Sequence, residues 1–183
     1  MTLRNFLARL ERCRLVASVQ GSEKSPTDHP ETLARLARAS VHEGVQILRL
    51  EGVKNIRTIK PILPLVTIGL LKRQYPGSDV YITPTKQDAD SLIDLGCEVV
   101  AFDATSRPRP KGTDLPGLIE HINRRKTLSL ADCDTPEAAE QAAAYGASMI
   151  STTLGGYTPG RERTEGPDLE LLREIVRRVD VPV

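Results

Sequence analysis

The sequence predicts an α/β fold on a parallel β-sheet, either an open doubly wound sheet or a (β/α)8 barrel. Short apolar runs alternate with helical patterns along the chain, which is typical of repeated βα units. Polar or charged residues follow each strand-like run. The first loop, GSEKSPTDHP, lacks the Gly-rich fingerprint of dinucleotide-binding sheets. We expect a single domain over residues 1–183, because the chain is long enough for one core and contains no linker.

Apolar spacing and helix-breaking residues set the elements of the first half. A short helix at residues 5–12 precedes the first strand. The next helix carries apolar residues three to four positions apart and ends at Gly44. The third ends before Pro64, because the residue before a proline disfavours helical backbone. The expected strands are residues 15–20, 45–50, 65–71 and 98–102, and the further helices are residues 30–43, 53–62 and 86–95.

The second half continues the same alternation. Thr135 is a natural N-cap, and Pro136 suits the first helical position. A long Gly-rich loop follows the sixth strand. The expected helices are residues 114–125, 136–145 and 168–179, and the expected strands are residues 127–131 and 147–151, with the start of a seventh at 181–183. The sequence thus predicts six βα units and part of a seventh.

Composition disfavours several classes of protein. Lys plus Arg is 25 and Asp plus Glu is 24, so no basic field indicates nucleic acid. Aromatic residues are 3%, which disfavours base stacking, and the apolar runs are too short to span a membrane. Cys13, Cys97 and Cys133 are odd in number and widely separated, which disfavours a zinc site or a disulfide framework. We expect a soluble cytoplasmic protein without nucleic-acid or membrane partners.

Polar side chains at the strand ends predict a site. In a barrel the carboxyl ends of all strands meet at one rim, where active sites form. Six strand ends out of six deliver polar groups here, which solvated loops alone explain poorly. These residues are Ser18 and Gln20, Arg49 and Glu51, Lys72 and Arg73, Asp103, Asp132, and Thr152 and Thr153.

The charged groups at this rim suit proton transfer next to a carbonyl. Lys72 follows a buried strand, and burial with neighbouring Arg73 or Arg49 would favour its neutral, basic form. Arg49 could polarise a carbonyl oxygen. Gln20 and Asp132 could hold sugar hydroxyls. A Schiff base on Lys72, as in aldolases, fits the same spacing.

Each residue also has a structural interpretation that the spacing leaves open. Lys72 could cap its strand, Gln20 a turn and Asp103 its own loop, although we count Asp103 among the substrate-binding candidates. Arg49 could form an ion pair with Asp103 or Asp132, and Asp132 could cap the helix that begins near Thr135. The basic loop at residues 107–111 is more typical of a solvated turn than of an anion site.

Six segments in order resemble the N-acetylmannosamine-6-phosphate 2-epimerase family. They are SVQGSEKSPTDHPE, GVQILRLEGVKNIR, IGLLKRQYPGSDVYITPT, AFDATSRPRP, LADCDTPEAA and ISTTLGGYTP, and the resemblance runs from about Leu15 to Val183. It implies a (β/α)8 barrel that interconverts N-acetylmannosamine 6-phosphate and N-acetylglucosamine 6-phosphate in sialic acid catabolism. It implies no cofactor and no metal.

The resemblance also assigns roles. Lys72 matches the family's lysine and is the expected base. Gln20, Arg49 and Asp132 match its substrate-binding glutamine, arginine and aspartate. Tyr81 and Thr83 fall in the matching substrate-loop motif, and we expect them to face the substrate.

Two further expectations concern the end of the chain. The family continues into a seventh strand with a Glu that completes the proton-transfer site, and this sequence ends at Val183, so we expect an incomplete barrel with little activity of its own. A second chain that completes it, as in a homodimer, is the alternative. Besides the epimerase, a Schiff-base aldolase-like enzyme and a non-catalytic sugar-phosphate-binding module stay open.

Overall fold

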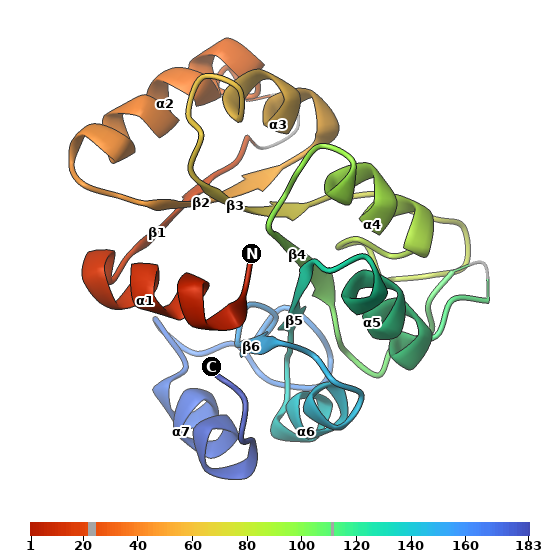
Figure 1. Cartoon of the computed structure of the whole chain (residues 1–183). Helices are drawn as coiled ribbons and strands as arrows, with labels where there is room; N and C mark the ends of the chain where they lie inside the picture. Colours follow the sequence, from red (N-terminus) through yellow and green to blue (C-terminus); the bar gives the residue numbers. More distant parts are fainter. Residues whose placement is uncertain (22–24, 111) are drawn as a thin grey trace.

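The computed structural model describes residues 1–21, 25–110 and 112–183. These residues form one six-stranded sheet in which all neighbouring strands are parallel and their order follows the chain (Figure 1). A doubly wound sheet reverses its strand order at a switch point, whereas a barrel keeps sequence order. The order therefore confirms a barrel-type fold. The strands are β1 (Val16–Val19), β2 (Ile47–Glu51), β3 (Val66–Leu70), β4 (Val99–Asp103), β5 (Leu128–Asp132) and β6 (Met149–Ser151).

A helix follows each strand and lies outside the curled sheet (Figure 1). The predicted cap is confirmed, because Thr135 accepts a hydrogen bond from the amide of Ala138 at 3.1 Å. The helices are α1 (Leu3–Cys13), α2 (Pro30–His42), α3 (Val53–Ile59), α4 (Lys86–Ile93), α5 (Leu115–Arg124), α6 (Pro136–Ala144) and α7 (Leu169–Arg178).

Most expected elements agree with the structure to within two residues, and two expectations differ further. Helix α3 ends at Ile59 rather than at residue 62, because Pro61 has no N–H to continue the helical hydrogen bonds. The strand predicted at residues 181–183 is wrong, since these residues are not in a strand. The amide of Ile150 in β6 does donate to the carbonyl of Pro182 at 2.9 Å. Proline has no N–H to return a ladder bond.

Alternation along the strands divides the apolar side chains into two layers. Leu48, Leu50 and Phe102 belong to the outer cluster, which includes residues of α2 to α7. Ile47 and Ile68 belong to the inner cluster. Because successive strand residues point to opposite faces, the inner face also receives the residues two positions further along each strand. This period directs Gln20, Arg49, Lys72, Asp103 and Asp132 to the barrel interior.

Helix α1 closes the amino-terminal end of the barrel. It crosses the inner side of the sheet (Figure 1) and packs on the inner cluster through Leu3, Leu7 and Leu10. Phe6 is only 2% exposed in that cluster. Arg14 then takes a left-handed conformation, with φ of 51°, and turns the chain into β1. The helix therefore leaves the opposite end of the barrel open for a site.

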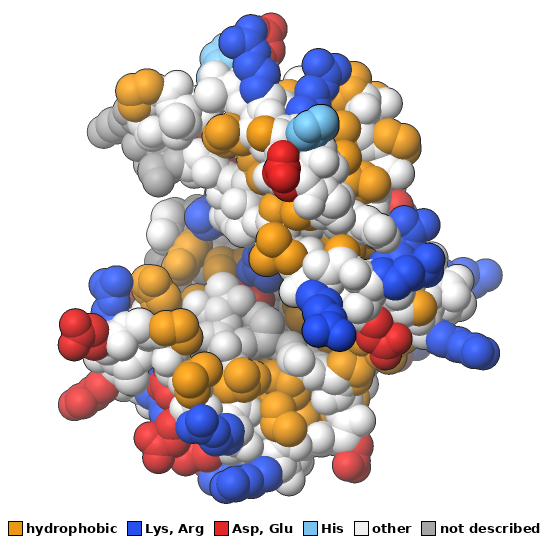
Figure 2. Space-filling model, turned by 90° about the vertical axis from the view of Figure 1, so that its left-hand side faces the viewer, with side chains coloured by type: hydrophobic (Ala, Val, Ile, Leu, Met, Phe, Trp, Pro, Cys, Tyr) orange, Lys and Arg blue, Asp and Glu red, His pale blue; other side chains and the backbone are white. Residues whose placement is uncertain are grey.

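Figure 2 shows the side of the molecule on which α2, β1, α1 and α7 lie. The surface is hollowed between its upper and lower parts, and hydrophobic side chains lie on both sides of the hollow. Among the described residues, β1 and β6 are the two edges of the sheet. No helix in the described part of the chain has the length and apolar character needed to cross a membrane.

Truncating Phe6 tests the contribution of α1. We expect Phe6→Ala to lower the free energy of unfolding by about 3–5 kcal/mol, because the change leaves a cavity in the inner cluster. Urea denaturation followed by circular dichroism measures this loss. Leu36→Ala is the control, since Leu36 is 48% exposed on α2 and its truncation opens no cavity. Equal losses in both variants would contradict the role of α1.

Candidate active site

A cavity opens at the carboxyl ends of the strands, as expected for a barrel. Its volume is about 400 Å³. It combines polar groups from β1, β2 and the segments after β3 and β6 with an apolar floor. The lining residues are Ser18, Gln20, Arg49, Leu70, Lys72, Tyr81, Ile82, Thr153, Leu154 and Tyr157. Four of the seven predicted site residues are therefore together in one cavity.

Arg49 and Asp132 form an ion pair across the barrel interior. Arg49 donates from Nη1 to Oδ1 at 3.2 Å and from Nη2 to Oδ2 at 2.6 Å. The Asp132 side chain is fully buried, whereas that of Arg49 is 13% exposed and reaches the cavity. Ser151 in β6 adds a hydrogen bond to Oδ1 at 2.7 Å. The carboxylate thus fixes the direction of the guanidinium.

This geometry decides between the alternatives for Asp132. The predicted ion pair with Arg49 is confirmed. The interpretation of Asp132 as a helix cap is wrong, because Thr135 caps α6. Asp132 is the last residue of β5, on the inner face, and its two oxygens are occupied by groups from β2 and β6. Its contact with the cavity is through Arg49, since Asp132 itself does not line it.

Lys72 lies at the rim of the cavity on the segment that follows β3. Its backbone is held by a bridge to Ile82 and by a hydrogen bond from its amide to Oε1 of Glu51 at 3.2 Å. The expected burial of Lys72 is wrong, because the residue is exposed. Strand β3 ends at Leu70, and the chain leaves the packed interior before Lys72. The amine is therefore accessible to a substrate that enters from solvent.

The other predicted residues separate into two groups. Gln20 lines the cavity and donates from Nε2 to Oγ of Ser18 at 2.7 Å, and Tyr81 also lines the cavity. Thr83 is fully buried, and its hydroxyl donates to the carbonyl of Ala101 at 2.6 Å. Asp103 is fully buried with Arg107 at 2.5 Å. Neither Thr83 nor Asp103 lines the cavity.

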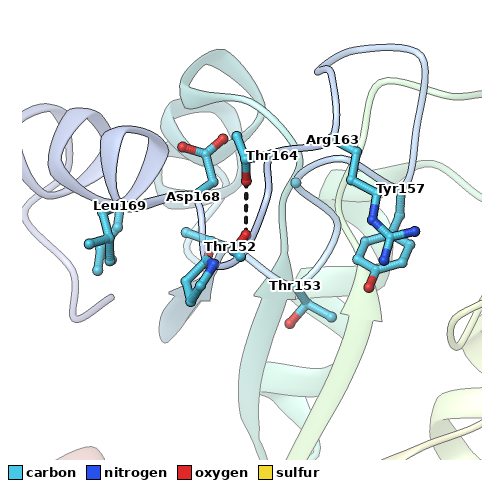
Figure 3. Close-up of a pocket in the computed structure, with 11 residues that line it drawn as sticks. Thr152, Thr153, Tyr157, Arg163, Thr164, Asp168 and Leu169 are labelled. Atoms are coloured by element: carbon cyan, nitrogen blue, oxygen red, sulfur yellow. Dashed lines mark hydrogen bonds between the residues drawn. The ribbon is translucent and has the colours of Figure 1, made fainter.

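A second cavity of about 380 Å³ adjoins the first along the loop between β6 and α7 (Figure 3). Thr153 and Tyr157 line both cavities. The guanidinium of Arg163 lies 5.5 Å from the centre of the Tyr157 ring. Asp168 caps α7 and pairs with Arg161, whose hydrogen bond, aided by the amide of Leu171, holds the pKa of Asp168 below its usual value.

Sequence reasoning missed Tyr157. It is 65% exposed at the mouth of the cavity, in a loop rich in glycine. The sequence feature that could have identified Tyr157 is an aromatic residue next to Gly155 and Gly156 in a chain with only 3% aromatics. Residues 22–24 of the first loop and Lys111 of the basic loop lie outside the described residues. In the described part of the chain, no three His, Cys, Asp or Glu side chains are grouped to hold a metal ion.

Comparison with known proteins identifies the family. Residues 33–181 match the family described as "Putative N-acetylmannosamine-6-phosphate epimerase". The chain belongs to this family. A relative from Clostridioides difficile named "Putative N-acetylmannosamine-6-phosphate 2-epimerase" is 42% identical over 170 residues, which cover 93% of this chain and 76% of the relative. A relative from Salmonella typhimurium is 38% identical over 176 residues, which cover 93% of this chain and 76% of the relative.

Solved structures agree with this membership. The N-acetylmannosamine-6-phosphate 2-epimerase of Clostridium perfringens superposes with a TM-score of 0.89 at 37% identity, over 92% of this chain and 73% of that structure. The 2-keto-3-deoxy-6-phosphogluconate aldolase of Zymomonas mobilis superposes with a TM-score of 0.65 at 12% identity, over 97% of this chain and 73% of that structure. At that identity the aldolase shares the fold alone. Lys72 and Arg49 line one cavity of this fold, and Asp132 holds Arg49 from a buried position.

The Arg49–Asp132 pair can be tested by a double substitution. We expect Arg49→Met to lower the free energy of unfolding by about 3 kcal/mol, because it leaves a buried carboxylate without its partner. Adding Asp132→Leu should recover most of this loss, since the buried charge is then gone. Urea denaturation measures both. A double variant as unstable as the single one would contradict the pairing. Glu120→Gln breaks the exposed Arg124–Glu120 pair and should change stability little.

Proposed function

We propose that this chain interconverts N-acetylmannosamine 6-phosphate and N-acetylglucosamine 6-phosphate by proton transfer at C2. The observation that carries the proposal is the meeting of Lys72 and the Arg49–Asp132 pair at one cavity in a chain of this family. The two sugars differ only in configuration at C2. In the open-chain form this carbon lies next to the C1 aldehyde, which acidifies its proton.

Proton transfer gives a role to four of the cavity residues. The amine of Lys72 takes the C2 proton, the C2–H bonding electrons move into the C1–C2 bond, and the carbonyl electrons move to O1. Arg49 is placed to stabilise the negative charge that develops on O1, because Asp132 holds its guanidinium in advance. A proton from solvent then adds to the opposite face of C2, the electrons on O1 re-form the carbonyl, and the epimer results. Gln20 and Tyr81 offer hydrogen bonds to sugar hydroxyls.

The wider setting follows from the substrate. We place the reaction in the breakdown of N-acetylmannosamine and sialic acid, in the cytoplasm, since a sugar phosphate carries charge that keeps it inside the cell. The aldehyde already acidifies C2, so the step needs no redox cofactor. We further propose that the chain acts as one domain, which is supported by the single sheet of the described residues.

Replacing Lys72 tests the reaction directly. We expect Lys72→Met to slow exchange of the C2 proton by on the order of 10²- to 10⁴-fold, because the base is lost. Proton NMR of the sugar phosphate in deuterated water measures the exchange. Lys126→Met is the control, because Lys126 is also exposed but lies just before β5, at the amino end of the strands.

Other results would redirect the assignment. Unchanged exchange in Lys72→Met would remove Lys72 as the base. Trapping of a carbonyl substrate on Lys72 by borohydride, without C2 exchange in the unaltered chain, would favour a Schiff-base aldolase-like enzyme. Thermal stabilisation by the sugar phosphate without exchange or trapping would favour a non-catalytic binding module.

A further inference from the structure

The segment that carries Lys72 is a hairpin-like excursion at the rim. Lys72 bridges Ile82 across it, the amide of Arg73 donates to the carbonyl of Tyr81 at 2.9 Å, and the amide of Thr83 donates to the carbonyl of Leu71 at 2.7 Å. The segment contributes both Lys72 and Tyr81 to the cavity. Its tip, residues 76–79, is largely exposed, and the amide of Ser78 donates to the carbonyl of Tyr75 at 3.2 Å within it. Contacts from outside the segment add to these.

The loop after β4 contacts this tip. Nη1 of Arg107 donates to the carbonyl of Asp79 at 3.1 Å, and the hydroxyl of Ser78 donates to the carbonyl of Pro108 at 2.8 Å. Arg109 donates to the carbonyl of Thr83 at 3.4 Å from the same loop. Three contacts thus join two segments that both follow strands on the cavity rim.

Arg107 is itself fixed by buried partners. Its Nη2 donates to Oδ2 of Asp103, and its Nε donates to the hydroxyl of Thr105 at 3.0 Å. The Asp103 side chain is fully buried, and that of Arg107 is 18% exposed. All three nitrogens of the guanidinium are therefore occupied by protein groups. The basic loop is neither a solvated turn nor an open anion site at this residue.

We propose that Arg107, held by Asp103, is a positioning residue for Lys72. The proposal rests on the proposed function, because it assigns the base to Lys72. The planar fork of the guanidinium joins the buried end of β4 to the backbone of the Lys72 hairpin. Asp103, which we expected to bind substrate, instead holds Arg107 from a buried position below the rim. Displacement of a reacting group by about 1 Å can cost on the order of 100-fold in rate, so such a contact affects turnover.

A second anchor lies on the other side of the hairpin. Asp88 is fully buried on α4 and accepts from Nη1 of Arg73 at 2.7 Å and from the hydroxyl of Tyr75 at 3.1 Å. It also completes the capping box with Thr85. Loss of the Arg107 contact therefore frees one side of the hairpin without releasing the whole segment, which makes a variant at Arg107 informative.

The test compares Arg107→Lys with a matched variant. Lysine keeps the charge beside Asp103 but lacks the planar fork that also reaches Asp79 and Thr105. We expect kcat for C2 exchange to fall about tenfold while KM stays within about twofold, since positioning and not binding is lost. Amide hydrogen exchange at Arg73 and Thr83 should become faster. Ser78→Ala should produce a smaller change in the same direction.

Lys60→Met is the control for a general loss of stability. It removes a part-buried ion pair, with Nζ 2.9 Å from Glu98, at the amino ends of the strands. We expect it to lower stability without changing kcat or the hairpin amides. Equal effects of Lys60→Met and Arg107→Lys on kcat would overturn the proposal, and so would an Arg107→Lys variant in which only KM rises.

The two hypotheses fail separately. An unaltered chain that leaves the C2 proton unexchanged would contradict the proposed function. The hairpin amides are measured without substrate, so unchanged hydrogen exchange in Arg107→Lys would overturn the positioning contact whatever the chain catalyses.

Discussion

The ion pair between Arg49 and Asp132 is the interaction on which the rest of the site depends. It joins β2 and β5, which are not neighbours in the sheet, so it spans the barrel interior. Placing a carboxylate in a fully buried position costs desolvation energy that even a bidentate partner offsets only in part. A pair of that kind is better explained by what it orients than by the stability it adds. Here it orients a guanidinium toward the cavity that Lys72 lines.

The period of two along the strands accounts for how much could be predicted from the sequence. Apolar alternation fixed the strands and helices to within a few residues, and it also directed Arg49, Lys72 and Asp132 to one face. The alternation of strands and helices along the chain was compatible with an open doubly wound sheet and with a barrel. The observed order of strands in the sheet decided between them. Patterns of neighbouring residues in the sequence were sufficient to predict the rim residues, because parallel strands bring all their carboxyl ends to one rim.

The errors share a different cause. Strand order left Asp103 and Asp132 as possible partners of Arg49, which lies 83 positions from Asp132, and no local pattern shows that Arg107 bonds a carbonyl 28 positions away. A carboxylate beside a helix start resembles a cap, although its oxygens are already used across the barrel. Lys72 looked buried because β3 is buried throughout, yet the strand ends two residues earlier. Thr83 matched a substrate motif, but its hydroxyl joins Leu71 to Ala101 inside the protein.

The two buried carboxylates at this rim each bind an arginine, and the two arginines are directed to different parts of the site. Asp132 and Asp103 are last residues of neighbouring strands, are paired in register, and each bonds an arginine. Arg49 is directed into the cavity, where a developing charge would meet it. Arg107 is directed away from the cavity, onto the loop that carries Lys72. An exposed lysine on a hairpin has many accessible positions, and catalysis needs few of them. Arg107, held by the buried carboxylate of Asp103, restricts the positions of the loop and leaves the amine of Lys72 accessible.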